Sequence, residues 1–386
     1  MHGRGFLLVA VVAAAAGAGC AGADRADDGV RSPSAGGSPS GLVPDDLATS
    51  SPPATQSPTN TPTPTPDPGP VTLAFAGDIH FEGHLRARLD DPASALAPIA
   101  PQLGAADVTV VNLETSVGAS GAPEPGKRFT FQAPPSAFTA LQAAGVDIVT
   151  MANNHAMDFG ADGLADTLAA VAAARPGLDV VGVGADAAEA FAPAVRDVRG
   201  TTVAVLGANV PDDPGADPTG HWAATETSAG VATALDPAPL LRAVAQARTV
   251  ADIVVVYLHW GVQGESCPSP SQTTLAAALS DPATGADVVV GSHAHRLQGA
   301  GRIRPNGAYV AYGLGNFVWY TQASDATAAT GVLTVTVDDG EVTGEAWAPG
   351  RIGADGLPVF ASGAAAQRLT ADRDALRDCA GLTALR

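Results

Sequence analysis

The chain has 386 residues and a formal net charge of −19, with 20 basic and 39 acidic side chains, and 46% of its residues are hydrophobic. Such an acidic chain lacks the clustered Lys and Arg that bind phosphate backbones, which excludes a nucleic-acid-binding function. The hydrophobic content is ample for a core and excludes a chain that is disordered throughout.

The first twenty residues have the pattern of a secretory signal. Arg4 precedes an apolar run at residues 6–16, and small residues lead from there to Cys20. This run is shorter than the roughly 20 apolar residues that span a bilayer. A cysteine directly after small residues resembles a bacterial lipobox, although Gly17 stands where Leu is usual. We therefore expect a signal peptide at 1–20 and an extracytoplasmic protein, either held at the membrane by a lipid on Cys20 or secreted.

Residues 21–70 differ sharply in composition from the rest of the chain. They contain many Ser, Thr and Pro residues, and they lack aromatic side chains. Such a segment buries too little apolar surface to offset its conformational entropy. We expect a disordered Ser/Thr/Pro-rich tether between the anchor and a folded domain.

From Val71 onward, short β-branched runs alternate with Ala- and Leu-rich stretches, and a folded domain is expected at 71–350, followed by a C-terminal tail at 351–386. Apolar runs predict buried strands at 71–76, 108–111, 146–151, 203–206, 253–258, 288–290 and 309–312. Helices are predicted at 161–174, 236–250 and 271–280, and a hairpin at 331–347. Apolar strands separated by helices indicate a layered α/β domain.

Two cysteines, Cys267 and Cys379, remain once a signal peptide is removed. In an oxidising compartment they would either form a disulfide or stay buried as small apolar residues. The sequence leaves both outcomes open.

Five of the predicted strands are followed by polar residues that are unusual at a strand end. Each of these residues alone would be read as a hydrogen-bonded loop residue, a helix cap or a turn former. Together they predict a metal centre of mixed nitrogen and oxygen ligands, because ligands of α/β sheets bind at the carboxyl ends of the strands. In chain order these residues are Asp78 and His80, Glu114, Asn154 with His155 and Asp158, His259, and His293 with His295.

The order of these residues resembles the calcineurin-like metallophosphoesterase pattern. The surrounding motifs are similar to those of the CapA family, bacterial proteins linked to poly-γ-glutamate capsule synthesis and export. The resemblance covers about 71–320 and implies an α/β fold, a four-layer αββα sandwich of the metallophosphoesterase type. The matching motifs are Phe-Ala-Gly-Asp at 75–78, Asn-Leu-Glu-Thr at 112–115, Phe-x-Phe-x-Ala-Pro at 129–134, Ala-Asn-Asn-His-Ala-Met-Asp-Phe-Gly at 152–160, His-Trp-Gly at 259–261 and Tyr-Gly-Leu-Gly-Asn-Phe at 312–317.

The resemblance also implies a role for each candidate residue. Two divalent metal ions, Mn, Fe or Zn, are implied, with His155 beside the leaving group and Asp158 orienting it. Three residues depart from the phosphoesterase pattern: Glu114 replaces Asp, Ala156 replaces an acidic residue, and Ser292 stands directly before His293, where the pattern Gly-His-x-His has Gly. The implied ligands are Asp78, His80 and His295 for one ion, Asn154, His259 and His293 for the other, and Glu114 bridging both.

Three functions remain open from the sequence. The leading hypothesis is an extracytoplasmic CapA-like hydrolase or transferase that uses two metal ions to activate water against an anionic polymer, poly-γ-glutamate or a wall polymer. The alternatives are a metal-dependent phosphomonoesterase or phosphodiesterase, and a non-catalytic lipoprotein subunit of a polymer synthase or export complex. Three arginines near His295 would be surface charges or would reverse the negative charge around the site; these are Arg296, Arg302 and Arg304.

Overall fold

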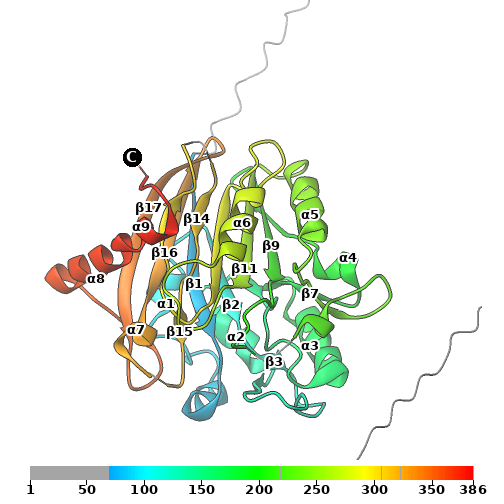
Figure 1. Ribbon diagram of the computed structural model, residues 1–386. Helices are drawn as coiled ribbons and strands as arrows, with labels where there is room; N and C mark the ends of the chain where they lie inside the picture. Colours follow the sequence, from blue (N-terminus) through cyan, green and yellow to red (C-terminus); the bar gives the residue numbers. More distant parts are fainter. Residues whose placement is uncertain (1–68, 217–218, 306, 322, 386) are drawn as a thin grey trace, which may run out of the picture. The chain divides into compact units, whose positions relative to one another are not determined.

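The computed structural model describes residues 69–216, 219–305, 307–321 and 323–385 (Figure 1). These residues belong to a single compact unit. The predicted signal peptide at 1–20, with Cys20, and nearly all of the predicted tether at 21–70 lie outside the described residues. In the described ranges, no helix has both the length and the apolar character needed to cross a bilayer.

The first of two large sheets has the strand order β18-β17-β16-β1-β2-β5-β6, and β15 pairs with the end of β1. The strands β1, β2, β5 and β6 are parallel, whereas β16 and β17 form an antiparallel hairpin where one was predicted. The bounds are β1 Val71–Ile79, β2 Val108–Leu113, β5 Ile148–Thr150, β6 Asp179–Val181, β15 Asn316–Val318, β16 Ala329–Asp338, β17 Glu341–Ile352 and β18 Pro358–Phe360.

The second large sheet has the order β13-β14-β12-β11-β9-β8. Its four central strands are parallel, and the two edge strands are antiparallel to them. The bounds are β8 Ala194–Val198, β9 Thr201–Asn209, β11 Ile253–Trp260, β12 Val288–His293, β13 Ala300–Arg302 and β14 Tyr309–Ala311. Two short pairs lie outside these sheets: β3 Ser116–Val117 with β4 Gln132–Ala133, and β7 Val183–Gly184 with β10 Gly230–Val231.

The helices vary from single turns to four turns. The α-helices are α1 Ala100–Leu103, α2 Ser136–Ala143, α3 Gly160–Ala174, α4 Ala187–Ala190, α5 Ala238–Arg248, α6 Pro270–Leu279, α7 Asp325–Ala328, α8 Gly363–Ala375 and α9 Arg377–Ala380. Two 3₁₀ helices, η1 and η2, span Gly83–Asp90 and Gly220–Trp222.

Three apolar layers show how the sheets and helices stack. Alternate residues of β1 point to opposite faces, as a strand requires: Phe75 packs against residues of the second sheet such as Val255, and Ala76 packs with residues of α2 and α3. The outer face of the second sheet packs in turn against α5 and α6, through residues such as Leu240. The fold is therefore the four-layer αββα sandwich that the resemblance implied.

The predicted elements agree with the observed ones in type and position. The predicted strands correspond to β1, β2, β5, β9, β11, β12 and β14, and the predicted helices to α3, α5 and α6. Residues 351–385, which the sequence analysis treated as a tail, contain the end of β17, then β18, α8 and α9. Cys379 in α9 forms a disulfide with Cys267, 112 residues earlier, which decides between the two outcomes that the sequence left open.

Candidate metal centre

The strands β1, β2, β11 and β12 end at one edge of the two sheets (Figure 1). The polar residues that follow the strands meet at this edge. Hydrogen bonds join the sheets at this edge. The Tyr257 hydroxyl on β11 donates to the carbonyl oxygen of Ala76 on β1 at 2.8 Å, and the N–H of His293 donates to Oδ2 of Asp78 at 3.2 Å. Side chains from both sheets therefore contribute to one centre.

The end of β1 approaches the segment before β15 too closely for any side chain at position 77. A Cβ atom on Gly77 would lie 1.9 Å from the carbonyl oxygen of Gly315. That oxygen accepts a hydrogen bond from the N–H of Asp78 at 2.9 Å. Glycine at position 77 therefore permits the close backbone contact that positions the Asp78 carboxylate.

Asn154, His259 and His293 form one group of potential ligands. Nε2 of His259 lies 2.8 Å from Oδ1 of Asn154 and 3.0 Å from Nδ1 of His293. Glu114 belongs to the same group, since ligand atoms of Glu114, His259 and His293 all lie within 4.8 Å of one another. Burial lowers the pKa of His259 well below its ordinary value, so the imidazole is neutral, the form that binds a metal.

Asp78 and His295 form the second group, again with Glu114, and ligand atoms of these three lie within 4.8 Å of one another. Oδ2 of Asp78 is 3.5 Å from Nδ1 of His295, and Oδ1 accepts a hydrogen bond from Asn112 at 2.8 Å. Burial alone would raise the pKa of Asp78, but the hydrogen bond and charge of His295 lower it below its ordinary value. The carboxylate is thus kept ionised, as a metal ligand must be.

Glu114 is shared by both groups. Its side chain is fully buried, and neither of its carboxylate oxygens has a hydrogen-bond partner. Burial and the nearby charge of Asp78 raise its pKa well above the ordinary value. A buried carboxylate without a partner is unfavourable unless a cation pairs with it. The residues present therefore fit divalent cations on either side of Glu114.

His80 lies among aromatic side chains at the end of β1. Its ring centroid is 4.9 Å from that of Phe131 and 4.2 Å from that of Trp319. Nδ1 accepts a hydrogen bond from the N–H of Glu82 at 3.0 Å, whereas Nε2 is buried without a partner. Burial lowers the pKa of His80 well below its ordinary value. A neutral ring with an unpartnered nitrogen fits a ligand, although His80 is in neither group of three.

His155 and Asp158, the candidate catalytic residues, form a hydrogen-bonded pair beside Glu114. Nδ1 of His155 lies 2.5 Å from Oδ2 of Asp158, and its Nε2 lies 3.6 Å from Oε1 of Glu114. The same Asp158 oxygen accepts the N–H of Phe131 at 2.6 Å. Burial raises the pKa of Asp158 to about 7, in spite of the charge of Lys127. The pair thus directs one nitrogen of His155 toward the candidate ligands.

The backbone of the His-x-His segment is left-handed at both histidines. The φ angles are 95° at His293 and 53° at His295. Non-glycine residues rarely adopt positive φ, because Cβ then crowds the neighbouring backbone. This backbone places His293 in one group of ligands and His295 in the other.

Sequence reasoning missed two charged side chains that contact the predicted site. Lys127, the chain's only lysine, bonds to Asp158 and to the carbonyl oxygen of Asn154. Asp213 contacts His293, its Oδ2 lying 3.3 Å from Nε2 of that ring. Asp213 follows β9, so the rule that led to the other candidates applies to it as well. Lys127 lies two residues before the motif at 129–134, and its uniqueness in the chain was the only signal.

The sequence left open whether three arginines near His295 are surface charges or reverse the charge around the site, and the second use is excluded for two of them. Arg302 lies on β13 opposite Tyr309, the first residue of β14, and β14 runs parallel to β12. Arg302 is therefore near the beginning of these strands and not near their carboxyl ends. It donates to the carbonyl oxygens of Gly307 and Val342, and Arg304 donates to that of Ser280.

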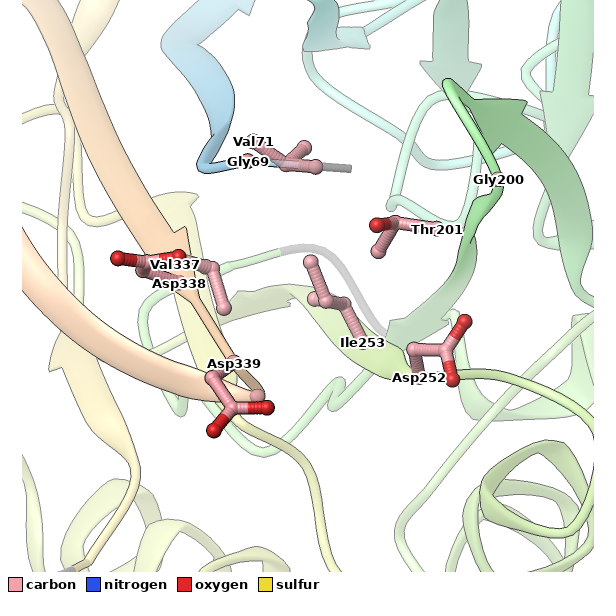
Figure 2. A pocket seen from close by; sticks show the side chains of 10 residues that line it. Gly69, Val71, Gly200, Thr201, Asp252, Ile253, Val337, Asp338 and Asp339 are labelled. Atoms are coloured by element: carbon pink, nitrogen blue, oxygen red, sulfur yellow. The ribbon is translucent and has the colours of Figure 1, made fainter. Parts of the chain in front are cut away.

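Two cavities differ in their relation to this centre. A cavity of about 580 Å³ lies at the opposite ends of the strands, beside Val71, Ile253 and three aspartates, and none of its lining residues is a predicted ligand (Figure 2). A cavity of about 420 Å³ is lined by Asn154, His293 and Asp213. The second cavity is thus the one that adjoins the candidate metal centre.

The sequence of the chain matches the model of one protein family and the sequences of several known proteins. The model of the family described as "Bacterial capsule synthesis protein PGA_cap" matches residues 72–321. The "PGA biosynthesis protein CapA" of Bacillus subtilis (strain 168) is 32% identical over 253 residues, which are 64% of this chain and 63% of the relative. The "Capsule biosynthesis protein CapA" of Bacillus anthracis is 30% identical over 268 residues, 66% of this chain and 62% of the relative. The chain thus matches about three-fifths of the length of these relatives.

Two solved structures of enzymes are also similar to the chain. A phosphatase from Mycoplasma pneumoniae matches with a TM-score of 0.45 and 14% identity, covering 78% of this chain and 96% of that protein. The NAD nucleotidase of Haemophilus influenzae matches with a TM-score of 0.41 and 12% identity, covering 82% of this chain and 64% of that protein.

Proposed function

The chain belongs to the bacterial capsule synthesis protein family PGA_cap, and on that premise we propose that its metal centre is the site of a hydrolase or transferase acting on an anionic polymer such as poly-γ-glutamate. One observation carries the proposal: the buried Glu114 carboxylate has no hydrogen-bond partner and belongs to two groups of potential metal ligands. A cation on either side of this carboxylate would supply the partner that it lacks.

Seven side chains would hold two divalent cations, Mn, Fe or Zn. Histidine and carboxylate ligands suit these metals, and none of the seven is a thiolate. When bound, two such cations supply an activated water and polarise the bond to be cleaved. The first cation would take Asp78, His80 and His295, the second Asn154, His259 and His293, and Glu114 would bridge them.

His155 is the residue suited to donate a proton to the leaving group. Its Nδ1 is engaged by Asp158, which fixes the ring, and its Nε2 faces Glu114 at 3.6 Å. A positioned general acid of this kind contributes about 10²–10⁴-fold to a rate. This pair favours a catalytic protein over a non-catalytic export subunit, since metal binding alone does not need it.

The proposed substrate is taken from the family. The names of the two relatives refer to capsule and PGA biosynthesis. A protein with a net charge of −19 repels an anionic polymer, so the site needs a local positive charge. Two divalent cations would make the centre locally positive. A polymer synthase or export complex is the natural partner for such an activity.

An extracytoplasmic location, with a lipid on Cys20 or in secreted form, belongs to the same proposal. The disulfide between Cys267 and Cys379 supports it, because disulfides persist in oxidising compartments and are rare in the cytosol.

The decisive experiment measures metal content and activity together. The purified full chain, reconstituted with Mn²⁺, is assayed against γ-glutamyl oligomers and against bis-p-nitrophenyl phosphate. We expect two equivalents of metal, stepwise loss in His259→Ala and Asp78→Ala, and cleavage or transfer of the γ-glutamyl oligomer. His221→Ala is the matched control, since the His221 side chain is 58% exposed.

Each other outcome has a definite meaning. Unchanged metal content in both ligand variants would contradict the metal centre. Turnover of the phosphodiester alone would establish the phosphoesterase alternative in place of the polymer hydrolase. Binding of the oligomer without turnover of either substrate would establish the non-catalytic subunit.

A further inference from the structure

Lys127 occupies a buried position beside the candidate catalytic pair. It lies in the segment between β3 and β4, and its side chain is only 2% exposed. Nζ donates to Oδ1 of Asp158 and to the carbonyl oxygen of Asn154, and it lies 3.3 Å from Nδ1 of His155. The ammonium group also stands over the ring of Trp222, 4.9 Å from its centroid.

These contacts fix the chain on both sides of His155. Lys127 bonds to the carbonyl oxygen of Asn154, the residue before His155, and to the carboxylate of Asp158, three residues after it. The other oxygen of Asp158 is occupied by His155 and by the N–H of Phe131. Lys127 therefore supplies a charged donor to Oδ1, and its removal would leave the buried carboxylate without that charge, a costly state.

The segment that carries Lys127 also covers the flat face of His155. The ring of Phe131 is stacked on that of His155, with centroids 4.1 Å apart and an interplanar angle of 12°. The N–H of Glu124, in the same segment, donates to the carbonyl oxygen of Asp158 at 2.8 Å. Asp158 thus holds the edge of the His155 ring, and Phe131 covers its face. Phe131 is part of the segment at 118–131, and Asp158 is hydrogen-bonded to that segment.

We propose that Lys127 is a positioning residue for His155: it anchors the segment at 118–131 and holds Asp158 so that Nε2 of His155 stays directed toward Glu114. The inference rests on the proposed function for its catalytic meaning. Lys127 is too deeply buried to contact a polymer, so it acts through its neighbours and not on the substrate.

The first test requires no turnover. Histidine modification by diethyl pyrocarbonate, followed residue by residue by mass spectrometry, reports how firmly His155 is held, with the exposed His84 as internal reference. We expect Lys127→Met to raise the modification rate of His155 at least fivefold relative to His84, and hydrogen exchange of the Phe131 amide to rise in parallel. Arg128→Met, which removes the neighbouring exposed cation, should change neither rate.

The second test uses activity and separates positioning from general damage. If Lys127 positions the proton donor, Lys127→Met should lower kcat about 100-fold for a substrate with a poor leaving group, and less than about threefold for its p-nitrophenyl or p-nitroanilide analogue. KM and the Mn²⁺ content should remain as in the wild type. Lys127→Arg should restore part of the lost rate.

The outcomes distinguish the two proposals. An unchanged modification rate and unchanged exchange in Lys127→Met would overturn the positioning role, whatever the activity of the protein. An equal loss of kcat for both leaving groups would also overturn it, since a loss of stability alone would produce that result. Absence of turnover by the wild type would contradict the proposed function, while the modification test would still decide the role of Lys127.

Discussion

Oδ2 of Asp213 lies 3.3 Å from Nε2 of His293. The same carboxylate accepts the N–H groups of Gln263 and Gly215, at 2.9 and 2.8 Å. Although burial would raise the pKa of Asp213, the His293 hydrogen bond and these backbone donors lower it to about 2. The anion fixes the His293 ring with Nδ1 toward His259, as carboxylates behind metal-binding histidines do.

Asp213→Asn should therefore weaken metal binding without removing a ligand. We expect a loss of about tenfold in the affinity for one of two Mn²⁺ ions, measured by isothermal titration calorimetry. Asp212→Asn is the control, because that exposed neighbour bonds to Ser271 and not to a histidine. Equal affinities in the two variants would show that Asp213 does not orient His293.

Glu114 and Asp158 should each lower the stability of the metal-free protein as the pH rises. The folded state raises the pKa of Glu114 well above its ordinary value and that of Asp158 to about 7. The folded protein therefore keeps both carboxyl groups protonated at pH values above about 4, where the unfolded chain has released these protons. The stability that the two groups contribute is complete at low pH and is lost as the pH rises toward 7. The buried neutral rings of His80 and His259 change the stability in the opposite sense, because the unfolded chain protonates them at low pH. We therefore expect the loss to appear in urea denaturation of the chelated proteins, between pH 5 and pH 8, as a fall in the stability of the wild type relative to Glu114→Gln.

Glu114→Gln provides the control for that measurement. The amide cannot ionise, so the variant should show a smaller pH dependence and a higher stability than the wild type at pH 8 when both are metal-free. Saturating Mn²⁺ should stabilise the wild type and leave the variant nearly unchanged. An equally steep pH dependence in Glu114→Gln would assign the effect to other groups.

Gly77→Ala should disturb the centre through packing alone. The added Cβ would lie 1.9 Å from the Gly315 carbonyl oxygen, so β1 or the segment before β15 must move, at a cost of about 1–3 kcal/mol. Because the N–H of Asp78 binds that same oxygen, metal affinity should fall with stability. Gly344→Ala is the control, since the nearest atom to an added Cβ there is 3.6 Å away, and it should leave stability and metal affinity unchanged. A Gly77→Ala variant with wild-type stability and metal affinity would refute the close contact.

Removing the disulfide should destabilise the fold and leave the metal centre intact. Cys267 and Cys379 are 112 residues apart in sequence, so the bridge restricts a long loop of the unfolded chain. The double variant Cys267→Ser/Cys379→Ser should lose about 2–4 kcal/mol, measured by urea denaturation without reductant. Mn²⁺ stoichiometry should stay the same, because neither cysteine is among the candidate ligands, and a reduced stoichiometry would contradict this separation.

The central strands and most candidate site residues could be predicted because their signals are local. An apolar β-branched run such as 253–258 is typical of a buried strand, and His259 follows it directly. Phe131 and Lys127 lie in a segment without regular periodicity, so their contacts with His155 come from tertiary structure alone. Helix α8 escaped prediction for a related reason: only Arg373 is buried in it, so the sequence has no apolar stripe there.

The left-handed backbone at His293 and His295 gives the metal ions a part in folding. Each such residue carries about 1–3 kcal/mol of conformational strain, which the metal-free protein must absorb without the coordination bonds that would offset it. Binding of ions to this segment would therefore offset that strain at the same moment as it neutralises Glu114. The concentration of divalent metal around the protein would then determine the stability of the His-x-His segment, and the centre would be complete only where those ions are present.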